Sequence, residues 1–291
     1  MGKSAWITLL FAATVFGAPA GATAAALGTC DPQALQQIPA RPAGAATASQ
    51  FVQTIAVADA DARESAIRTE LLDGNVPQFL RRLVPVDMAA NGPNGEHVVV
   101  CALPDYLAVG SDPDFLRLPM RLATALSVAA QFGFVLPTRK IVDAIAAQAP
   151  VHLAPQPLPA GPQMRSTDYY RTHNDLIEAQ RRSLGVELGE LVDGDKKDLV
   201  MTNRLWTKLT NVAIYGWHRL DGTPIQPLST LHGERYADYS HGVRLIGAVA
   251  YVDGRPRPLV DLLEDPAWAD TLSDEGPMPR VGELMDVLRT Q

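Results

Sequence analysis

Hydrophobic positions recur along the chain at two spacings, one typical of helices and one typical of strands. Apolar residues three or four positions apart indicate amphipathic helices, because that spacing puts them on one helical face. This spacing occurs in segments 61–72, 121–132, 138–149, 173–184, 259–263 and 281–289. Gly74, Gly133 and Gly185 follow three of these segments, and glycine commonly ends a helix.

The strand-like segments come in pairs that short turns separate. Asp221-Gly222 and Asp253-Gly254 each lie between apolar runs, which is a strong hairpin signal. A longer loop rich in glycine and asparagine separates another pair. The predicted pairs are 84–88 with 97–102, 212–218 with 223–228, and 243–252 with 255–259.

The order of these elements predicts an α+β fold. Helices lie mainly in the N-terminal half and antiparallel β-hairpins in the C-terminal half, without the regular alternation of a doubly wound sheet. Residues 50–291 are long enough for one domain. Segment 150–162 contains five prolines and is an extended connector that would divide the domain if it has two lobes.

The first residues are typical of a secretory signal peptide. Lys3 precedes an apolar run at 6–16, and small residues suited to cleavage follow at 22–24. The apolar run is too short for a bilayer span of about 20 residues. We therefore expect residues 1–24 to be a signal peptide and the chain to be secreted or periplasmic. An uncleaved anchor or buried helix, and a lipoprotein linked through Cys30, are the less favoured alternatives.

An Ala/Pro-rich stretch at 25–49 is expected to be a linker or a loosely docked tail. The chain has two cysteines, Cys30 and Cys101. In an oxidising compartment they can form one disulfide that ties this tail to the domain, although two free thiols fit the sequence equally well.

Composition excludes several function classes. The chain has 291 residues, a formal net charge of −7 and 47% hydrophobic residues, which is typical of a folded domain. Without a basic run it is a poor binder of nucleic acid. It also lacks the glycine-rich nucleotide loops, the GxSxG elbow and the HExxH motif. We expect an extracellular polymer, peptide or sugar as partner.

The densest group of chemically active residues lies near the C-terminus. His218, His232 and His241 fall within 24 residues, half of the six histidines of the chain. Segment 232–241 also holds Asp238 and two tyrosines. This mixture of polar and aromatic residues is unusual in a core strand or a solvent loop, and it favours a cleft.

Two chemistries fit this group. In the first, His218, His232, Asp238 and His241 supply three ligands to zinc, whose fourth ligand is water. In the second, no metal is bound: His241 or His232 is the base, Asp238 orients it, and Ser240 or a water attacks. In either case one of three residues would steady the developing charge, namely Lys197, Tyr239 and Arg244.

The sequence therefore predicts a hydrolase that acts on an extracellular or cell-envelope polymer. The main alternative is a secreted carbohydrate- or peptide-binding protein without catalysis. Trp206, Trp217 and Trp268 suit sugar stacking, although large aromatic residues more often lie in the core. The histidines and tyrosines also fit a structural role as hydrogen-bonding residues that tie loops to a sheet.

Overall fold

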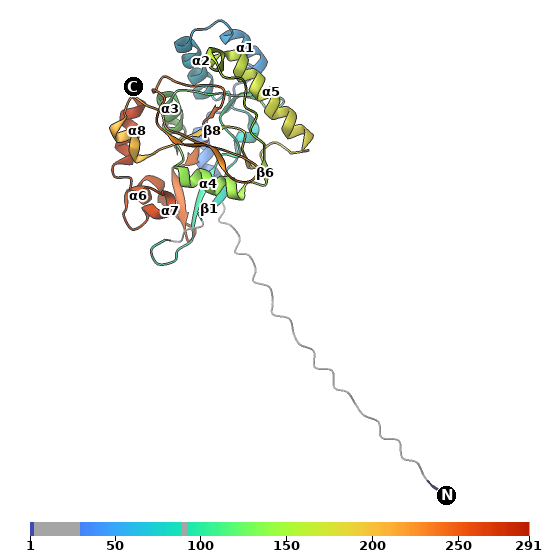
Figure 1. Cartoon of the computed structure of the whole chain (residues 1–291), viewed down its shortest axis with the longest axis vertical. Coiled ribbons are helices and arrows are strands. Elements are labelled where there is room, and N and C mark those ends of the chain that lie inside the picture. The colour runs from blue at the N-terminus through green and yellow to red at the C-terminus, as the bar shows by residue number, and fades with distance from the viewer. Residues whose placement is uncertain (3–29, 89–91, 291) are drawn as a thin grey trace.

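The computed structural model describes residues 1–2, 30–88 and 92–290, and Figure 1 draws the other residues as a thin grey trace. Nearly all of the predicted signal peptide, residues 1–24, lies outside this described part. The predicted fold class is confirmed: the fold is α+β, with helices mainly in the N-terminal half.

A six-stranded antiparallel sheet forms the centre of the molecule. Its order is β14-β13-β2-β12-β5, and β1 also pairs with β2. Every residue of β2 is buried, in keeping with its place inside the sheet, where it pairs with β1, β12 and β13. The strands are β1 (Val84–Met88), β2 (Val98–Ala102), β5 (Phe134–Val135), β12 (Ile246–Gly247), β13 (Val249–Val252) and β14 (Arg255–Pro258).

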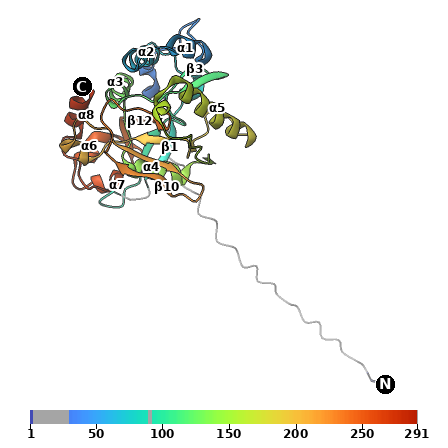
Figure 2. The same ribbon diagram turned by 45° about the horizontal axis from the view of Figure 1, so that its top comes forward.

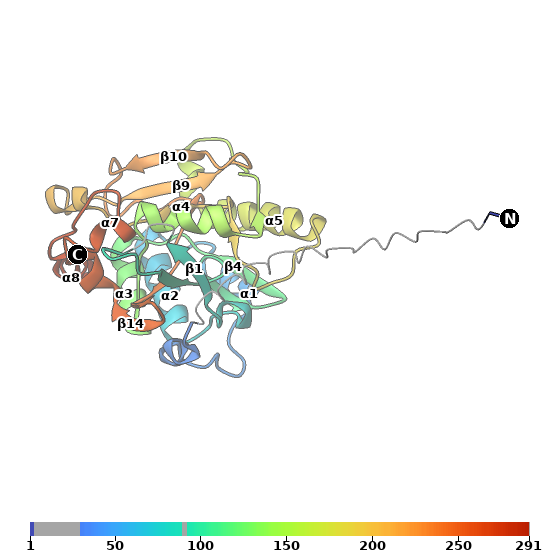
Figure 3. The ribbon, with the colours of Figure 1, turned by 90° about the horizontal axis from the view of Figure 1, so that it is seen from below.

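A second sheet has the order β10-β9-β8-β11 and carries the candidate site. Its strands are β8 (Lys197–Leu199), β9 (Ile214–His218), β10 (Pro224–Ser229) and β11 (His241–Gly242). β8 pairs antiparallel with β9 but parallel with β11, so Lys197 lies beside both Gly216 and His241. Figure 3 shows β9 and β10 along one side of the molecule.

Two further strand pairs are small. β3 (Ala108–Ser111) and β4 (Asp114–Arg117) form an antiparallel hairpin, while β6 (Val151–His152) and β7 (Val192–Asp193) pair in parallel. The hairpins predicted at 84–102, 212–228 and 243–259 are all present.

Helices lie around the central sheet (Figures 1 and 2). Several begin at a residue whose side chain caps the first turn, as Thr138 does for α4 and Ser166 for α5. α3 ends at Gly133, whose φ of 75° suits glycine. The α-helices are α1 (Ala48–Ile55), α2 (Ala60–Leu72), α3 (Leu122–Phe132), α4 (Arg139–Gln148), α5 (Thr167–Ser183), α6 (Leu259–Glu264), α7 (Ala269–Leu272) and α8 (Val281–Arg289). The 3-10 helices are η1 (Pro32–Gln37), η2 (Gln78–Leu80), η3 (Pro162–Arg165) and η4 (Asn203–Thr207).

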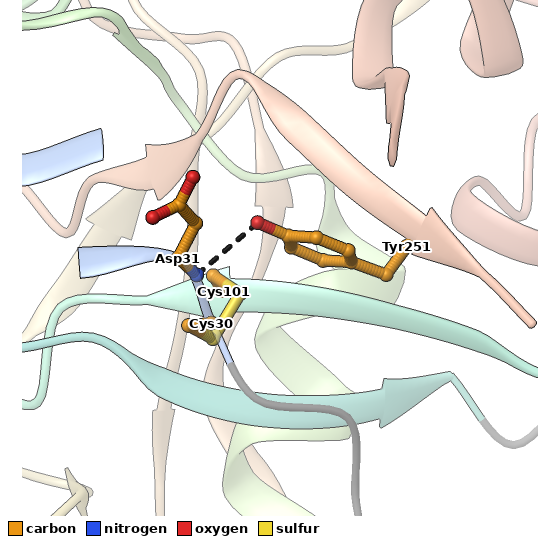
Figure 4. Close-up of a disulfide and its surroundings, with 4 residues drawn as sticks. All are labelled: Cys30, Asp31, Cys101 and Tyr251. Atoms are coloured by element: carbon orange, nitrogen blue, oxygen red, sulfur yellow. Dashed lines mark hydrogen bonds between the residues drawn. A yellow bond between two sulfur atoms is a disulfide. The ribbon is translucent and has the colours of Figure 1, made fainter. Parts of the chain in front are cut away.

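The predicted disulfide between Cys30 and Cys101 is present, and it fastens the N-terminal tail to β2 (Figure 4). The backbone N–H of Asp31 also donates to the Tyr251 hydroxyl at 3.1 Å. The described part of the tail is docked more closely than its composition predicts, since Ile38 lies buried in the core.

Within the described ranges, no helix is both long and apolar enough to cross a bilayer.

Candidate functional site

A tight turn before β11 brings Tyr236, Asp238, Ser240 and His241 together. One carboxylate oxygen of Asp238 accepts hydrogen bonds from the backbone N–H and the hydroxyl of Ser240, at 2.8 and 2.6 Å. The other accepts from the Tyr236 hydroxyl at 2.9 Å. Local bonds of an aspartate to the backbone two residues on stabilise turns. These bonds fix the position at which His241 enters the sheet.

His241 is fully buried, yet neither of its ring nitrogens has a hydrogen-bond partner among the described residues. Its Nε2 lies 4.0 Å from a carboxylate oxygen of Asp238. Burial lowers the pKa of His241 to about 4, against the attraction of Asp238, because the imidazolium form loses its hydration. His241 is therefore a neutral imidazole at pH 7, with a lone pair that can accept a proton.

Two aromatic rings lie over His241 on the side that is partly exposed. The rings of His232 and Tyr236 stack in parallel, with centroids 4.0 Å apart, and both residues are half-buried. Their centroids lie 6.4 and 5.7 Å from that of His241. The guanidinium of Arg165 lies over the Tyr236 ring at 5.4 Å. This half-buried stack therefore lies next to the buried His241 ring.

Lys197 is the partner of His241 in the β8–β11 strand pair, so it places a positive charge beside His241. Its Nζ lies 5.3 Å from the centroid of the Trp217 ring, a cation–π distance. Within the described residues this ammonium has neither an ion pair nor a hydrogen bond, and the buried Trp217 Nε1–H is also unpaired. Burial lowers the pKa of Lys197 although Asp238 opposes the shift. The site thus has one ammonium, that of Lys197, without a partner among the described residues.

The sequence-based interpretation missed a supporting layer behind this site. Lys196 is fully buried; its Nζ donates to the Tyr239 carbonyl at 2.7 Å and lies 3.2 Å from His173 Nδ1. The His173 ring packs edge-on against Tyr239 and Trp217. Burial lowers the pKa of Lys196 to about 7. Lys196 and His173 thereby hold the turn at Tyr239 and the ring of Trp217 in place.

Residues 195–198 are a run of four charged residues, a pattern that usually faces solvent, but three of the four are buried. The reason lies in a distant part of the chain. Arg117 is fully buried and pairs with Asp105 at 2.6 Å, with Glu178 at 2.9 Å and with Asp195 at 3.4 Å. A buried cation needs such partners, and Arg117 draws this segment inward.

The structure does not place His218 with the other two histidines. Its ring lies between two carboxylates, with Nε2 3.1 Å from Asp143 and Nδ1 3.4 Å from Asp193. The Tyr215 hydroxyl also donates to Asp143, at 2.8 Å. Burial alone would lower the pKa of His218, but the two carboxylates outweigh it and raise the pKa to about 9. His218 is therefore a cation in a separate ion cluster.

Three other predicted site residues have structural contacts. Arg244 is buried and donates to the carbonyls of Leu103, Pro104 and Val192, so it is not available to steady a charge near His241. The Ser240 hydroxyl is bound to Asp238 rather than to a histidine, which makes it a poor nucleophile. The Tyr239 hydroxyl bonds to the backbone of Leu158.

No group of three or more His, Cys, Asp or Glu side chains in the described residues is placed to hold a metal ion. The four predicted zinc ligands are divided: His218 belongs to the cluster with Asp143 and Asp193, while His232, Asp238 and His241 lie together. His218 is therefore not placed to share a metal ion with the other three candidate ligands.

Comparisons of the chain with models of protein families, with curated proteins and with solved structures found no match.

Proposed function

We propose that the chain is a hydrolase that cleaves an amide or ester bond of an extracellular or cell-envelope polymer, with His241 as a metal-free general base. The observation that carries the proposal is the buried, neutral His241 with two unbonded ring nitrogens beside the free ammonium of Lys197. Perturbed titratable groups of this kind cluster at catalytic sites. The extracellular location follows from the predicted signal peptide.

The proposed reaction begins when His241 takes a proton from a water molecule. The water oxygen forms a bond to the substrate carbonyl carbon, and the carbonyl electrons move to its oxygen. Lys197 stabilises this oxyanion, and the carboxylate of Asp238 stabilises the imidazolium. When the carbonyl re-forms, the bond to the leaving nitrogen or oxygen breaks, and His241 returns the proton to it.

The charge at Lys197 bears on whether the bond cleaved is an acyl bond or a glycosidic bond. Glycosidic cleavage passes through a transition state with positive charge on the sugar ring. An ammonium beside His241 would repel that charge, whereas it attracts the oxyanion of acyl transfer. The geometry therefore favours a carbonyl substrate over a glycosidic bond.

Substrate access requires a movement. His232 and Tyr236 stack over His241 and belong to a loop between β10 and β11. Loops carry many binding residues because they can rearrange on a rigid scaffold. We expect this pair to shift and to form one wall around the bound substrate.

The same stack supports a second candidate function, a sugar- or peptide-binding protein without catalysis. His232 and Tyr236 form a half-buried aromatic face, and Arg165 extends it. A binding site of this type would use the stack itself and would not need His241 as a base.

The test uses purified secreted chain and two probes: bacterial peptidoglycan, with new amino groups counted, and an acetylated polysaccharide, with released acetate counted. We expect turnover on one probe to fall about 10²- to 10³-fold in Lys197→Met, as for loss of an oxyanion donor, and less in Lys197→Arg. A chelator should leave the rate unchanged.

Two results would contradict the proposal. Loss of activity with a chelator and its recovery with Zn²⁺ would support the zinc mechanism instead. Binding of a polymer without any turnover, lost in Tyr236→Ala but not in Lys197→Met, would favour the binding protein.

A further inference from the structure

A cavity of about 510 Å³ lies at the end of the central sheet, beside β14. Its walls come from β13, β14 and the turn between them, the loop before β2 and the residue before α7. They are Glu96, Val252, Asp253, Arg255, Pro256, Arg257 and Trp268. Figure 3 places β14 on the side of the molecule opposite β10, so this cavity is separate from the His241 site.

The charged side chains around the cavity differ in whether they have hydrogen-bond partners. Both carboxylate oxygens of Glu96 accept bonds from Asn94, and the carboxylate of Asp253 accepts from the backbone N–H of His97 at 2.9 Å. In contrast, the guanidinium groups of Arg255 and Arg257 have no hydrogen bond or ion pair among the described residues. The two guanidiniums are therefore the groups of the lining that still have donors for a ligand, while the carboxylates of Glu96 and Asp253 balance their formal charge.

The spacing of the two arginines suits a ligand with two neighbouring negative charges. Arg255 and Arg257 are two positions apart on one strand, so they project from the same face about 7 Å apart. The guanidinium of Arg257 lies 4.9 Å from the centroid of the Trp268 ring, which holds it in place. A planar, held guanidinium can bind a carboxylate through two parallel hydrogen bonds.

The strand itself is unsuited to pairing with a peptide. β14 is the edge strand of the sheet, but Pro256 and Pro258 have no backbone N–H to offer a further strand. Recognition at this edge must therefore use side chains: two guanidiniums and the indole of Trp268. A flat apolar ring beside charged donors suits the C–H faces and acidic groups of a charged sugar.

We propose that this cavity, defined by Arg255, Arg257 and Trp268, is a binding site for an anionic polysaccharide with acidic groups on neighbouring sugars. The site is distinct from the His241 site and does not depend on its chemistry. It would hold the chain on a charged polymer at the cell surface or outside the cell.

The test measures binding of the full secreted chain to trigalacturonate by calorimetry, with the fully methyl-esterified trisaccharide as the uncharged comparison. We expect the affinity for trigalacturonate to fall at least tenfold in Arg255→Gln/Arg257→Gln and in high salt. The matched control Arg68→Gln/Arg219→Gln removes the same charge from two exposed arginines elsewhere and should bind as the original chain does. Arg255 is exposed, so Arg255→Gln alone gives a folded variant if the double one is unstable, with an expected loss of at least threefold.

Three outcomes would overturn the proposal. They are equal binding of the methyl-esterified trisaccharide, an affinity unchanged by Arg255→Gln and by the double substitution, and stronger arginine-dependent binding to phosphatidylglycerol vesicles than to trigalacturonate. The last would identify a membrane surface as the partner.

Discussion

The disulfide between Cys30 and Cys101 should contribute a large part of the stability of the folded chain. It closes a loop of 71 residues between the tail and β2, the buried central strand. Cross-linking removes conformational freedom from the unfolded chain, and a loop of this length gives about 4 kcal/mol by the chain-entropy relation. Replacing both cysteines by serine should lower the free energy of unfolding by about that amount.

The measurement is unfolding in urea at equilibrium, followed by circular dichroism, with thermal melting beside it. A loss of this size lowers the melting temperature of a domain this large by roughly 8–16 °C. Tyr251→Phe is the control, because it removes the hydrogen bond from Asp31 but leaves the disulfide, and it should cost about 1 kcal/mol. A loss below about 1 kcal/mol in the double serine variant would refute the reasoning, since it would mean that the tail constrains the unfolded chain very little.

Three further predictions concern the buried titratable side chains of His218, His241 and Lys196. His218 has a folded pKa of about 9, above its usual 6.5, so its stabilising effect is complete below about pH 6.5 and is lost as the pH rises through 9. His218→Asn should therefore cost on the order of 2 kcal/mol at pH 6 but little at pH 10 in urea unfolding; an equal cost at both pH values would contradict the assignment. Turnover should fall below about pH 4, where His241 gains a proton and can no longer act as a base, and a pH–rate profile with its acid limb near 7 would be inconsistent with this burial. Lys196→Met should destabilise the chain by on the order of 1–3 kcal/mol, because the buried Tyr239 carbonyl loses its charged donor; unchanged urea unfolding would count against that bond.

Local patterns in the sequence were enough to predict much of the fold. The Asp253-Gly254 turn, the strand at 84–88 and the end of a helix at Gly133 all depend on residues close in the chain, and the structure has each of them. The grouping of His232 with His241 could also be predicted, because a short loop joins them.

Long-range pairing explains what the sequence could not show. The parallel pairing of β8 with β11 puts Lys197 beside His241, although 43 positions separate them, and no local pattern specifies that register. The burial of Lys196 depends on a network around Arg117. His218 lies apart because Gly216 and Trp217 both have positive φ, 96° and 57°, which interrupts the alternation of side chains along β9.

The most direct test of the account is the turnover number of His241→Gln beside that of His232→Gln, measured on whichever polymer probe the original chain cleaves. If His241 is the general base, the turnover number should fall about 10²- to 10⁴-fold in His241→Gln and change much less in His232→Gln. Circular dichroism should show that both variants are folded. A folded His241→Gln variant that keeps the original turnover number would contradict the central claim.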